Sequence, residues 1–548
     1  MKTEAAATRH VFLLRVLLIV CAVFWVFSPA IRGDWLMDDD FYLPQNALLH
    51  DPHRLWKIWF VPGSLIEYYP IEATIQAIQW HFWGMHTLGY HLTNAALHVV
   101  SALLLWRLLA KFGLRYAWLG GLLFAVHPAV VESVAWIAEF KNTLSLPPFL
   151  LALCSWVDFE NRGRSRDYLL ALGFFFVAML CKISMALFPF VIFLYAWWKR
   201  DRVGWNDLKH SIPFFAISFV LGLTTVGAGA SFFHAHQQTQ VNPNVGGPAM
   251  HIALAGQSLA YYFAKCAWPA GMVPISPHQW DVHPESPLAY TPWLALAAML
   301  ALFWQRRAGW GRDALLGVGF FLLNLLPFIG LNSVTYMGYT WVMDHFLYLP
   351  MIGLIGLAIA AFDSIESRLS VRARPWLAVS AAVAFALLAL ESETYAECFV
   401  GPEALWTYTI TRNPSSWLAH NNLGVVHLEL AGIAKDPKVK QAEIEKALPE
   451  FNTALSLNSG SVDAHTNLGF AYEMEGRLQD AMQQYEDTLQ INPNFGNAQY
   501  HLGHLLEQMG QIPEAILHYE QAVLINPRND DARAALDRLQ KRKPGSAE

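Results

Sequence analysis

Eleven apolar runs of about 14 to 23 residues occupy most of the first 395 residues of this 548-residue chain. A helix needs roughly 20 apolar residues to cross a bilayer, because lipid offers no hydrogen-bond partners to the backbone. Only 15% of the residues are charged, which excludes a disordered chain, a nucleic-acid-binding protein and an ordinary cytosolic enzyme. We predict an all-α, polytopic membrane domain over residues 1–395, with spans at about 11–30, 88–110, 116–137, 143–157, 168–181, 184–198, 211–231, 291–305, 314–331, 342–362 and 375–391.

Some of these runs allow more than one interpretation. The first run could be a cleaved signal peptide, but its length and the many later runs favour a membrane span. The stretch from Tyr168 to Trp198 is too long for one crossing, and Lys182 interrupts it. This predicts a helical hairpin with Lys182 at its tip. The short runs 143–157, 168–181 and 184–198 could be tilted or partly re-entrant.

The basic residues predict the orientation of the spans, because cytoplasmic loops carry an excess of Lys and Arg. The N-terminal segment and alternate loops hold 19 of the 25 cations in the membrane part. This alternation requires that the apolar segment 251–272, which contains Lys265 and Pro269, does not cross the membrane. We therefore predict a cytoplasmic N-terminus and an extracytoplasmic C-terminus.

The first extracytoplasmic loop, residues 31–87, is long enough to hold its own helices. Apolar residues recur in it at helical spacing, and a second apolar edge precedes them. Such a helix either lies in the membrane interface or packs against the bundle, and the sequence does not separate these two interpretations. The residues concerned are Ile71, Ile75, Ile78 and Phe82, with Trp56, Trp59 and Phe60 on the earlier edge.

The C-terminal quarter, residues 412–548, is a repeat array. The motif A-x-x-x-L-G begins at Ala464 and again at Ala498, 34 residues later, and Ala532 opens a partial third copy. Asn-Pro pairs at 492–493 and 526–527 keep the same period. An earlier copy at 419–424 is displaced by an insertion of 11 residues. A 34-residue period of this kind resembles the tetratricopeptide repeat, which stacks helix pairs into a solenoid.

Several ionisable residues lie where a membrane face is expected, which indicates function by default. The predicted topology puts them all at the extracytoplasmic end, although they come from four distant parts of the chain. A carboxylate can act as a general base, and a nearby cation can hold a phosphate leaving group. The structural alternatives are a solvated acidic loop, a snorkelling lysine and an ion pair, but the convergence favours a site. The residues are Asp38, Asp39, Asp40, Glu132, Glu139, Lys141, Lys182, Asp344 and His345.

Other motifs are weak or missing. Neither a GxGxxG nor a GxxxxGK[ST] nucleotide signature occurs, and the five cysteines are scattered without a CxxC pair. The spacings of His81, His86, His91 and His98 do not bring these four histidines to one helix face. We therefore expect them to be packing or interfacial residues, except that His91 and His98 also fit the pattern of the second span.

The order of the polar motifs resembles the GT-C superfamily of polytopic glycosyltransferases. The similar segments are Asp38–Asn46, Tyr90–His98, His127–Trp136, Cys181–Lys182 and Asp344–Pro350. Together with the repeat tail, the chain is similar to the transmembrane and tetratricopeptide-repeat O-mannosyltransferases and their prokaryotic relatives. The resemblance covers essentially the whole chain.

The resemblance implies an inverting glycosyltransferase. Such an enzyme transfers mannose or another hexose from a polyprenyl-phosphate carrier to an acceptor, here a protein Ser or Thr hydroxyl, on the extracytoplasmic face. An aspartate of the first loop would be the base, with Asp39 preferred and Asp38 or Asp40 as alternatives, and Glu132 would orient the acceptor or the base. Lys182, His345 and Lys141 would bind the donor phosphate, with His127, Glu139, Asp344 and Tyr348 in supporting positions.

The chain departs from the family pattern in two places. It has Phe140-Lys141-Asn142 where relatives often show Arg-Lys-Asp, and His345 stands where many relatives carry Arg. A histidine holds phosphate by charge only when protonated, unlike an arginine. These departures bear on the donor, its affinity and the activity itself. Clustered aspartates suit Mg²⁺ or Mn²⁺, but the resemblance implies no required metal or cofactor.

Two other function classes remain as alternatives. One is a non-catalytic membrane scaffold that recruits secreted proteins through its repeats, although an anchor needs one helix rather than eleven. The other is a transporter, which would concentrate its charges near the bilayer midplane and show two repeated halves. The absence of a retention signal and the looser motifs favour the inner membrane of a bacterium.

Overall fold

The computed structural model describes residues 2–235, 245–276, 282–527 and 529–541. Within these ranges every regular element is a helix, as predicted. The chain divides into two compact units, Met1–Ala404 and Leu405–Glu548. The first unit contains the apolar runs and the second contains the repeats.

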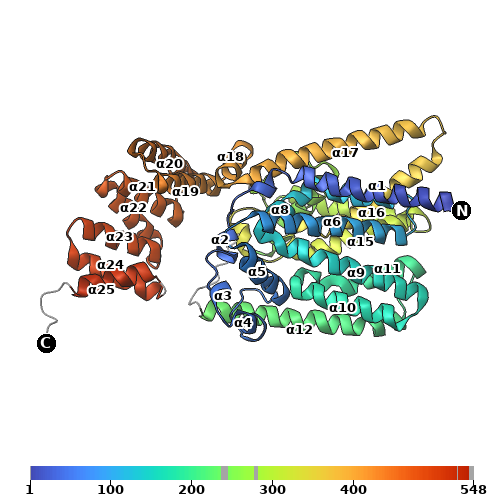
Figure 1. Cartoon of the computed structure of the whole chain (residues 1–548), viewed down its shortest axis with the longest axis horizontal. Helices are drawn as coiled ribbons and strands as arrows, with labels where there is room; N and C mark the ends of the chain where they lie inside the picture. The colour runs from blue at the N-terminus through green and yellow to red at the C-terminus, as the bar shows by residue number, and fades with distance from the viewer. Residues whose placement is uncertain (1, 236–244, 277–281, 528, 542–548) are drawn as a thin grey trace. The chain divides into compact units, whose positions relative to one another are not determined.

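The long helices of the first unit follow the predicted runs. Among the described residues, six helical segments are long and apolar enough to cross a membrane, and a seventh crossing is available if one bent pair counts as a single span. The number of eleven stays a prediction, because α10 and α11 have only 17 and 13 residues. The helices are α1 (Lys2–Val26), α6 (Leu88–Lys111), α7 (Ala117–Val126), α9 (Phe140–Arg162), α10 (Ser165–Cys181), α11 (Phe188–Arg200), α12 (Trp205–Ala235), α13 (Pro248–Ala267), α14 (Thr291–Gln305), α15 (Trp310–Leu325), α16 (Met351–Arg368) and α17 (Arg374–Ala396) (Figure 1).

Two predicted spans are broken at one end by irregular backbone. The run 116–137 is helical only to Val126, and the chain then bends by 61° into short turns. Pro128 causes this break, since proline lacks an N–H and disfavours a helical conformation in the residue before it. The run 342–362 begins with a 3-10 turn at Asp344–Leu347, and α16 starts only at Met351. Non-helical backbone at this depth is tolerated where it lines a protein interior.

The predicted hairpin is present. Lys182 is the residue after α10, and its backbone is extended, with φ −162° and ψ 129°. A 3-10 turn at Ile183–Leu187 then leads into α11. Lys182 is 93% buried instead of reaching out to water, so the snorkelling alternative does not describe it.

The first loop folds as four helices at one end of the bundle (Figure 1). They are α2 (Asp39–Tyr42), α3 (Ala47–His50), α4 (Arg54–Phe60) and α5 (Pro70–Trp83). The apolar edge of α5 points outward, since Ile78 and Phe82 are 49% and 73% exposed. The buried face of α5 carries Ala73 and Ala77 together with three polar residues. An outward apolar face favours the membrane-interface interpretation over packing against the bundle.

The second unit has the helix pairs of a tetratricopeptide-repeat array. Gly424, Gly469 and Gly503 let an aromatic ring of the paired helix approach closely; for example, a Cβ on Gly469 would lie 2.7 Å from Tyr485 Cε1. The insertion lengthens the first pair, in which α19 has 17 and α20 has 21 residues, against 13 and 14 in the next. The helices are α18 (Pro402–Arg412), α19 (Trp417–Ile433), α20 (Pro437–Leu457), α21 (Val462–Met474), α22 (Leu478–Ile491), α23 (Gly496–Gln508), α24 (Ile512–Ile525) and α25 (Asp530–Lys541).

Candidate active site

The breaks in the two spans bring Glu132, Glu139 and His345 together. The segment from Val126 to Phe140 is a succession of short turns, namely a 3-10 turn at Pro128–Val130, α8 (Val131–Ala135) and a 3-10 turn at Ile137–Glu139. Glu132 Oε1 lies 2.8 Å from His345 Nδ1, and Glu132 Oε2 accepts the backbone N–H of His345 at 3.1 Å. The other ring nitrogen, Nε2, is 3.8 Å from Glu139 Oε1. His345 is therefore held between two buried carboxylates.

Two lysines, the half-buried Lys141 and the buried Lys182, complete this network. Lys141 Nζ lies 3.7 Å from Glu139 Oε1 and 5.3 Å from the centre of the Tyr42 ring. Lys182 Nζ donates to Asn142 Oδ1, and the amide nitrogen of Asn142 donates to Glu139. Asn142, one of the departures from the family pattern, thus connects Lys182 to the carboxylate.

The carboxylate of Glu139 is the anion that His345, Lys141 and Lys182 surround. Burial alone would raise the pKa of Glu139, but His345, Lys141 and Lys182 together lower this pKa to about 2. Burial lowers the pKa of Lys182 to about 8, with Glu139 opposing the change. The pKa of Lys141 is held well above its ordinary value by Glu139 and Tyr42, which outweigh burial. Glu139 therefore stays ionised and keeps Lys141 charged inside the protein.

The three aspartates of the first loop have different environments. Asp39 is fully buried, and its two carboxylate oxygens accept the backbone N–H groups of Leu36 at 2.9 Å and Ala138 at 2.7 Å. Burial raises the pKa of Asp39 to about 8 in spite of these bonds. Asp38 has an exposed side chain, although the surrounding segments partly desolvate its carboxylate and so raise its pKa, which the positive charge of Lys141 opposes. The pKa of Asp40 is also raised by desolvation and, less strongly, by the negative charge of Asp34.

The turn that precedes these aspartates is strained at Met37. Met37, which precedes Asp38, has a φ of 44°, and the described residues contain only one other non-glycine residue with positive φ, Asp201. This conformation costs an L-residue roughly 1–2 kcal/mol, and such strain clusters at functional sites. The bonds from Asp39 to Leu36 and Ala138 hold the turn against the segment that carries Glu139.

Three other predicted residues lie outside this network and have structural partners. His127 Nδ1 accepts the N–H of Ala129, which caps the 3-10 turn, and its Nε2 lies 3.2 Å from the carbonyl of Cys266. The hydroxyl of Tyr348 is 2.9 Å from His98 Nδ1 in the core. Asp344 Oδ1 accepts from the hydroxyl of Tyr261 at 3.3 Å. These contacts connect helices instead of pointing to the lysines.

The structure adds residues of the first loop that the sequence reasoning missed. Glu67 accepts from the Tyr69 hydroxyl at 3.0 Å, and both residues contribute to holding the pKa of Lys141 high. Glu72 is 7% exposed, and burial raises its pKa to about 8 while Lys141 and Lys182 oppose the rise. The pattern of α5 contains a signal for this, because Glu72, Gln76 and Gln79 recur at helical spacing beside the apolar edge.

The buried face of α5 carries a polar stripe that begins at Glu72. Gln76 and Gln79 follow it at helical spacing and are 3% and 5% exposed. Within the described part of the chain, the amide nitrogens of both glutamines have no hydrogen-bond partner. Buried, unpaired amides cost free energy, so a ligand with oxygen acceptors would stabilise this face. In the same described ranges, no group of three or more His, Cys, Asp or Glu side chains is arranged to hold a metal ion.

Comparison with known proteins agrees with this architecture. Residues 70–226 match the dolichyl-phosphate-mannose-protein mannosyltransferase family, and residues 438–495 and 474–539 match tetratricopeptide repeats. Protein O-mannosyl-transferase Tmtc3 of Drosophila melanogaster is 23% identical over 73% of this chain and 50% of its own length. Protein O-mannosyl-transferase TMTC3 of Mus musculus is 23% identical over 84% of this chain and 53% of its own length.

A shorter match is Protein O-mannosyl-transferase TMTC4 of Mus musculus, 29% identical over 28% of this chain and 26% of its own length. The chain spans about half the length of the two longer relatives. The membrane helices, the mannosyltransferase match and the repeats occur in one chain and in the order predicted. The chain is thus homologous to the TMTC protein O-mannosyl-transferases, with a domain of the dolichyl-phosphate-mannose-protein mannosyltransferase family followed by C-terminal tetratricopeptide repeats.

Proposed function

We propose that this protein transfers a hexose, with mannose as the first candidate, from a polyprenyl-phosphate carrier to a protein Ser or Thr hydroxyl. The observation that carries the proposal is the cluster of the half-buried Lys141 with the buried Lys182 and His345 around Glu139, at the breaks of two membrane helices. Cations fixed in a site of low dielectric stabilise the charge that develops on a leaving phosphate. Burying charged groups within a membrane helix bundle costs free energy, which indicates that these groups have a function.

In the proposed reaction the acceptor oxygen attacks the anomeric carbon of the sugar. A C–O bond forms to the acceptor while the bond between the anomeric carbon and the phosphate oxygen breaks on the opposite side, which inverts the configuration. The phosphate leaves with the electron pair and is stabilised by Lys141, Lys182 and, when protonated, His345. The acceptor proton passes to a carboxylate base.

Asp38 suits the role of base better than Asp39. A base must be ionised and within reach of the acceptor hydroxyl. Asp38 is exposed beside Lys141, whereas both oxygens of Asp39 are occupied by backbone N–H groups. We therefore assign Asp39 a positioning role, in which it fixes the strained turn at Met37. Glu132 holds His345 in place through two bonds.

The polar stripe on α5 is the proposed contact for sugar hydroxyls. Glu72 shares the electrostatic environment of Lys141 and Lys182, so the stripe begins beside the proposed phosphate position. The unpaired amides of Gln76 and Gln79 can donate to hydroxyl oxygens. A hydrogen-bonded sugar hydroxyl would give the specificity that an apolar wall cannot.

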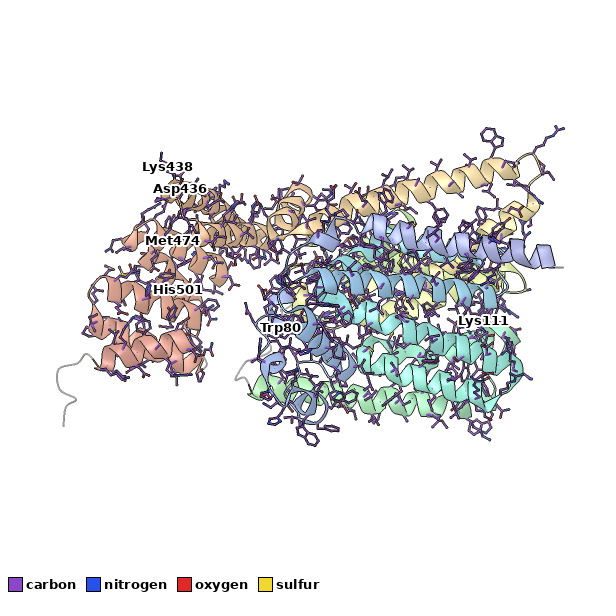
Figure 2. All side chains as sticks on the ribbon, in the orientation of Figure 1. Trp80, Lys111, Asp436, Lys438, Met474 and His501 are labelled. Carbon is purple, nitrogen blue, oxygen red and sulfur yellow. The ribbon has the colours of Figure 1, made fainter. Side chains whose placement is uncertain are left out.

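The transfer is proposed to occur on the extracytoplasmic face of a bacterial inner membrane. The support is the positive-inside pattern, together with Lys111 and Arg162 at the ends of α6 and α9 that lie away from the cluster. Figure 2 shows Lys111 and Trp80, a residue of α5, at opposite ends of the bundle. Single cysteines introduced at Asp40 and Tyr500 should react with an impermeant thiol reagent from outside, and one at Arg202 should not.

The decisive experiment is transfer in proteoliposomes. The full chain, a polyprenyl-phosphate mannose and a mixture of Ser- and Thr-containing acceptor peptides should yield peptides heavier by one hexose. Asp38→Asn should abolish the product, and Asp40→Asn is the matched control that should keep it. If wild type gives no product while the repeats still capture secreted proteins, the scaffold alternative holds.

A further inference from the structure

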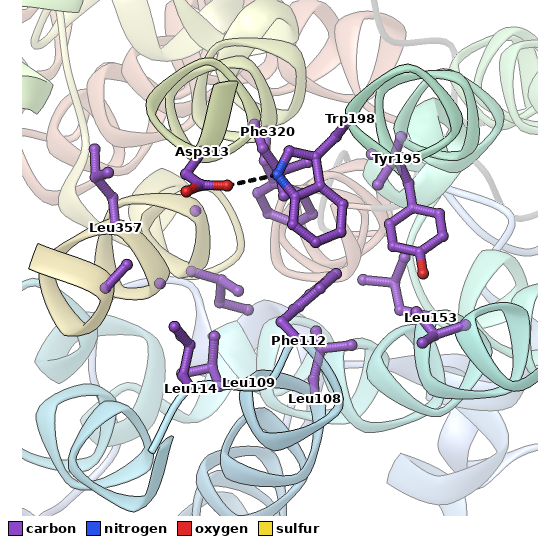
Figure 3. A pocket seen from close by; sticks show the side chains of 18 of the residues that line it. Leu108, Leu109, Phe112, Leu114, Leu153, Tyr195, Trp198, Asp313, Phe320 and Leu357 are labelled. Atoms are coloured by element: carbon purple, nitrogen blue, oxygen red, sulfur yellow. Dashed lines mark hydrogen bonds between the residues drawn. The ribbon is translucent and has the colours of Figure 1, made fainter. Parts of the chain in front are cut away.

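A partly open cavity of about 180 Å³ lies among α6, α9, α11, α15 and α16. Figure 3 shows its wall of apolar side chains, which includes Leu108, Leu153, Phe320 and Leu357. Of the twenty lining residues, only Asp313 carries a charge. Protein interiors contain few voids larger than a water molecule, so a cavity of this size needs an explanation.

The cavity is separate from the candidate active site, although two helices reach both. On α6, Asn94 bonds to Trp136 of the turn region and to Thr143 of α9, and the cavity begins fourteen residues later at Leu108. On α9, Asn142 belongs to the lysine network and Val157 lines the cavity. At 1.5 Å per residue these intervals place the cavity about 20 Å further along the helices. It therefore faces the opposite membrane leaflet.

The mouth of the cavity has the features of a membrane interface. The indole N–H of Trp198 donates to Asp313 Oδ1 at 2.8 Å (Figure 3). The ring of Phe112 lies 5.4 Å from Trp198 and 5.8 Å from Tyr195. Aromatic side chains with one polar atom concentrate at the boundary between lipid tails and headgroups. The apolar interior thus opens at the depth where a lipid chain joins its headgroup.

Basic residues predominate beside this mouth. Lys111 and Lys199 are sequence neighbours of the mouth residues Phe112 and Trp198, and Arg312 precedes Asp313. Lys111 bonds to Asp158 at 2.6 Å, and Lys199 donates to the carbonyl of Glu160 at 3.0 Å. The phosphate of a membrane phospholipid would lie beside these cations while its acyl chain enters the cavity.

The apolar wall determines which kind of molecule can fill the cavity. Water needs two to four polar partners to occupy a cavity, and this wall offers almost none. An empty cavity loses the dispersion contacts of its lining atoms, which an alkyl chain would restore. We propose that the cavity binds one acyl chain of a membrane phospholipid from the leaflet opposite the candidate active site. This inference does not depend on the proposed transferase activity.

Helix α16 supplies a matched pair of variants. Ala360 lines the cavity, and Ala358 on the same helix is exposed on the outer surface. Ala360→Phe fills the space, whereas Ala358→Phe adds the same ring where lipid already surrounds the helix. The full chain is reconstituted in vesicles of phosphatidylethanolamine that contain a trace of the same lipid with a diazirine on its acyl chain. After photolysis, labelled peptides are identified by mass spectrometry.

We expect labelling of cavity-lining peptides from α6 and α16 in wild type and Ala358→Phe, and loss of that labelling in Ala360→Phe. Unchanged labelling in Ala360→Phe would overturn the proposal. Displacement of the label by a polyprenyl phosphate, but not by phospholipid, would overturn the assigned source. Thermal unfolding checks that each variant is folded, and Leu316→Phe is the second cavity-filling variant. Native mass spectrometry of wild type must also show a retained phospholipid, and its absence counts against the site.

Discussion

Glu132 and His345, which are 213 positions apart in the chain, are joined by two bonds, since one carboxylate holds both the ring Nδ1 at 2.8 Å and the backbone N–H at 3.1 Å of the same histidine. These two bonds hold the 3-10 turn at 344–347 against α8. They also orient the second ring nitrogen of His345, Nε2, toward Glu139. The orientation of His345 is thus determined by the carboxylate of Glu132. Loss of either bond should disturb donor binding more than the fold.

The first prediction concerns Glu132. Glu132→Gln keeps the shape of the side chain but loses the negative charge that faces His345. We expect the KM for the polyprenyl-phosphate donor to rise about 10-fold, with a smaller change in kcat, because a charge-assisted hydrogen bond contributes about 1.5–3 kcal/mol. Steady-state kinetics in proteoliposomes measure both constants. An equal loss in kcat with an unchanged KM would contradict this positioning role.

The second prediction separates His345 from an arginine at the same position. A histidine offers a positive charge only when protonated, whereas arginine is charged at any working pH. His345→Arg, which has a permanent charge, should therefore bind the donor at least as tightly as wild type, and His345→Gln, which has none, should bind it more weakly. Binding of a fluorescent polyprenyl phosphate to the three proteins at one pH tests the difference. Equal affinity in all three would show that His345 does not contribute a charge to donor binding.

The third prediction concerns Lys182, whose ammonium group bonds to Asn142. Lys182→Met should weaken donor binding about 10- to 100-fold, the range expected for loss of a charged contact. Lys182→Arg keeps the charge and should retain most of the affinity. Asn142→Leu should have an intermediate effect, because it frees Lys182 from Glu139 without removing the cation. Equal affinity in all three variants would remove Lys182 from the phosphate site.

The fourth prediction is a pH dependence of stability. The pKa of Glu72 is raised to about 8 in the folded protein, against an ordinary value near 4.5. A raised folded-state pKa gives stability that is complete below the unfolded pKa and is lost as the pH rises through the folded pKa. The Tm in detergent should therefore fall between pH 5 and 8. Glu72→Gln cannot ionise, so its Tm should fall less over this window, and an identical slope would argue against a protonated Glu72.

The fifth prediction tests the repeat packing with two glycines of one helix. A Cβ on Gly424 would lie 2.6 Å from the ring of Phe451, whereas nothing lies within 4 Å of a Cβ on Gly432. Gly424→Ala should destabilise the first helix pair by about 1–3 kcal/mol through overpacking, and Gly432→Ala should be neutral or slightly stabilising. Hydrogen exchange of α19 and α20 in the full chain reports both effects. Similar exchange in the two variants would contradict the close approach.

The sequence by itself determined the all-helical class, the hairpin at Lys182 and the repeat array. These features follow from local rules, because apolar run length, a charged interruption and a 34-residue period each act over short stretches of chain. The sequence also selected Glu132, Glu139, Lys141, Lys182 and His345 as residues of one site, since charges are rare in apolar surroundings.

Only the tertiary structure decided which of these residues touch. The three consecutive aspartates are alike in sequence, but folding buries Asp39 against Ala138 and leaves Asp38 exposed near Lys141. Likewise, His127 and Tyr348 fit the motif pattern and yet have structural partners. The cavity behind Trp198 has no local signature, because five helices build it together. Burial and pairing depend on contacts between distant segments, and a pattern along the chain does not contain them.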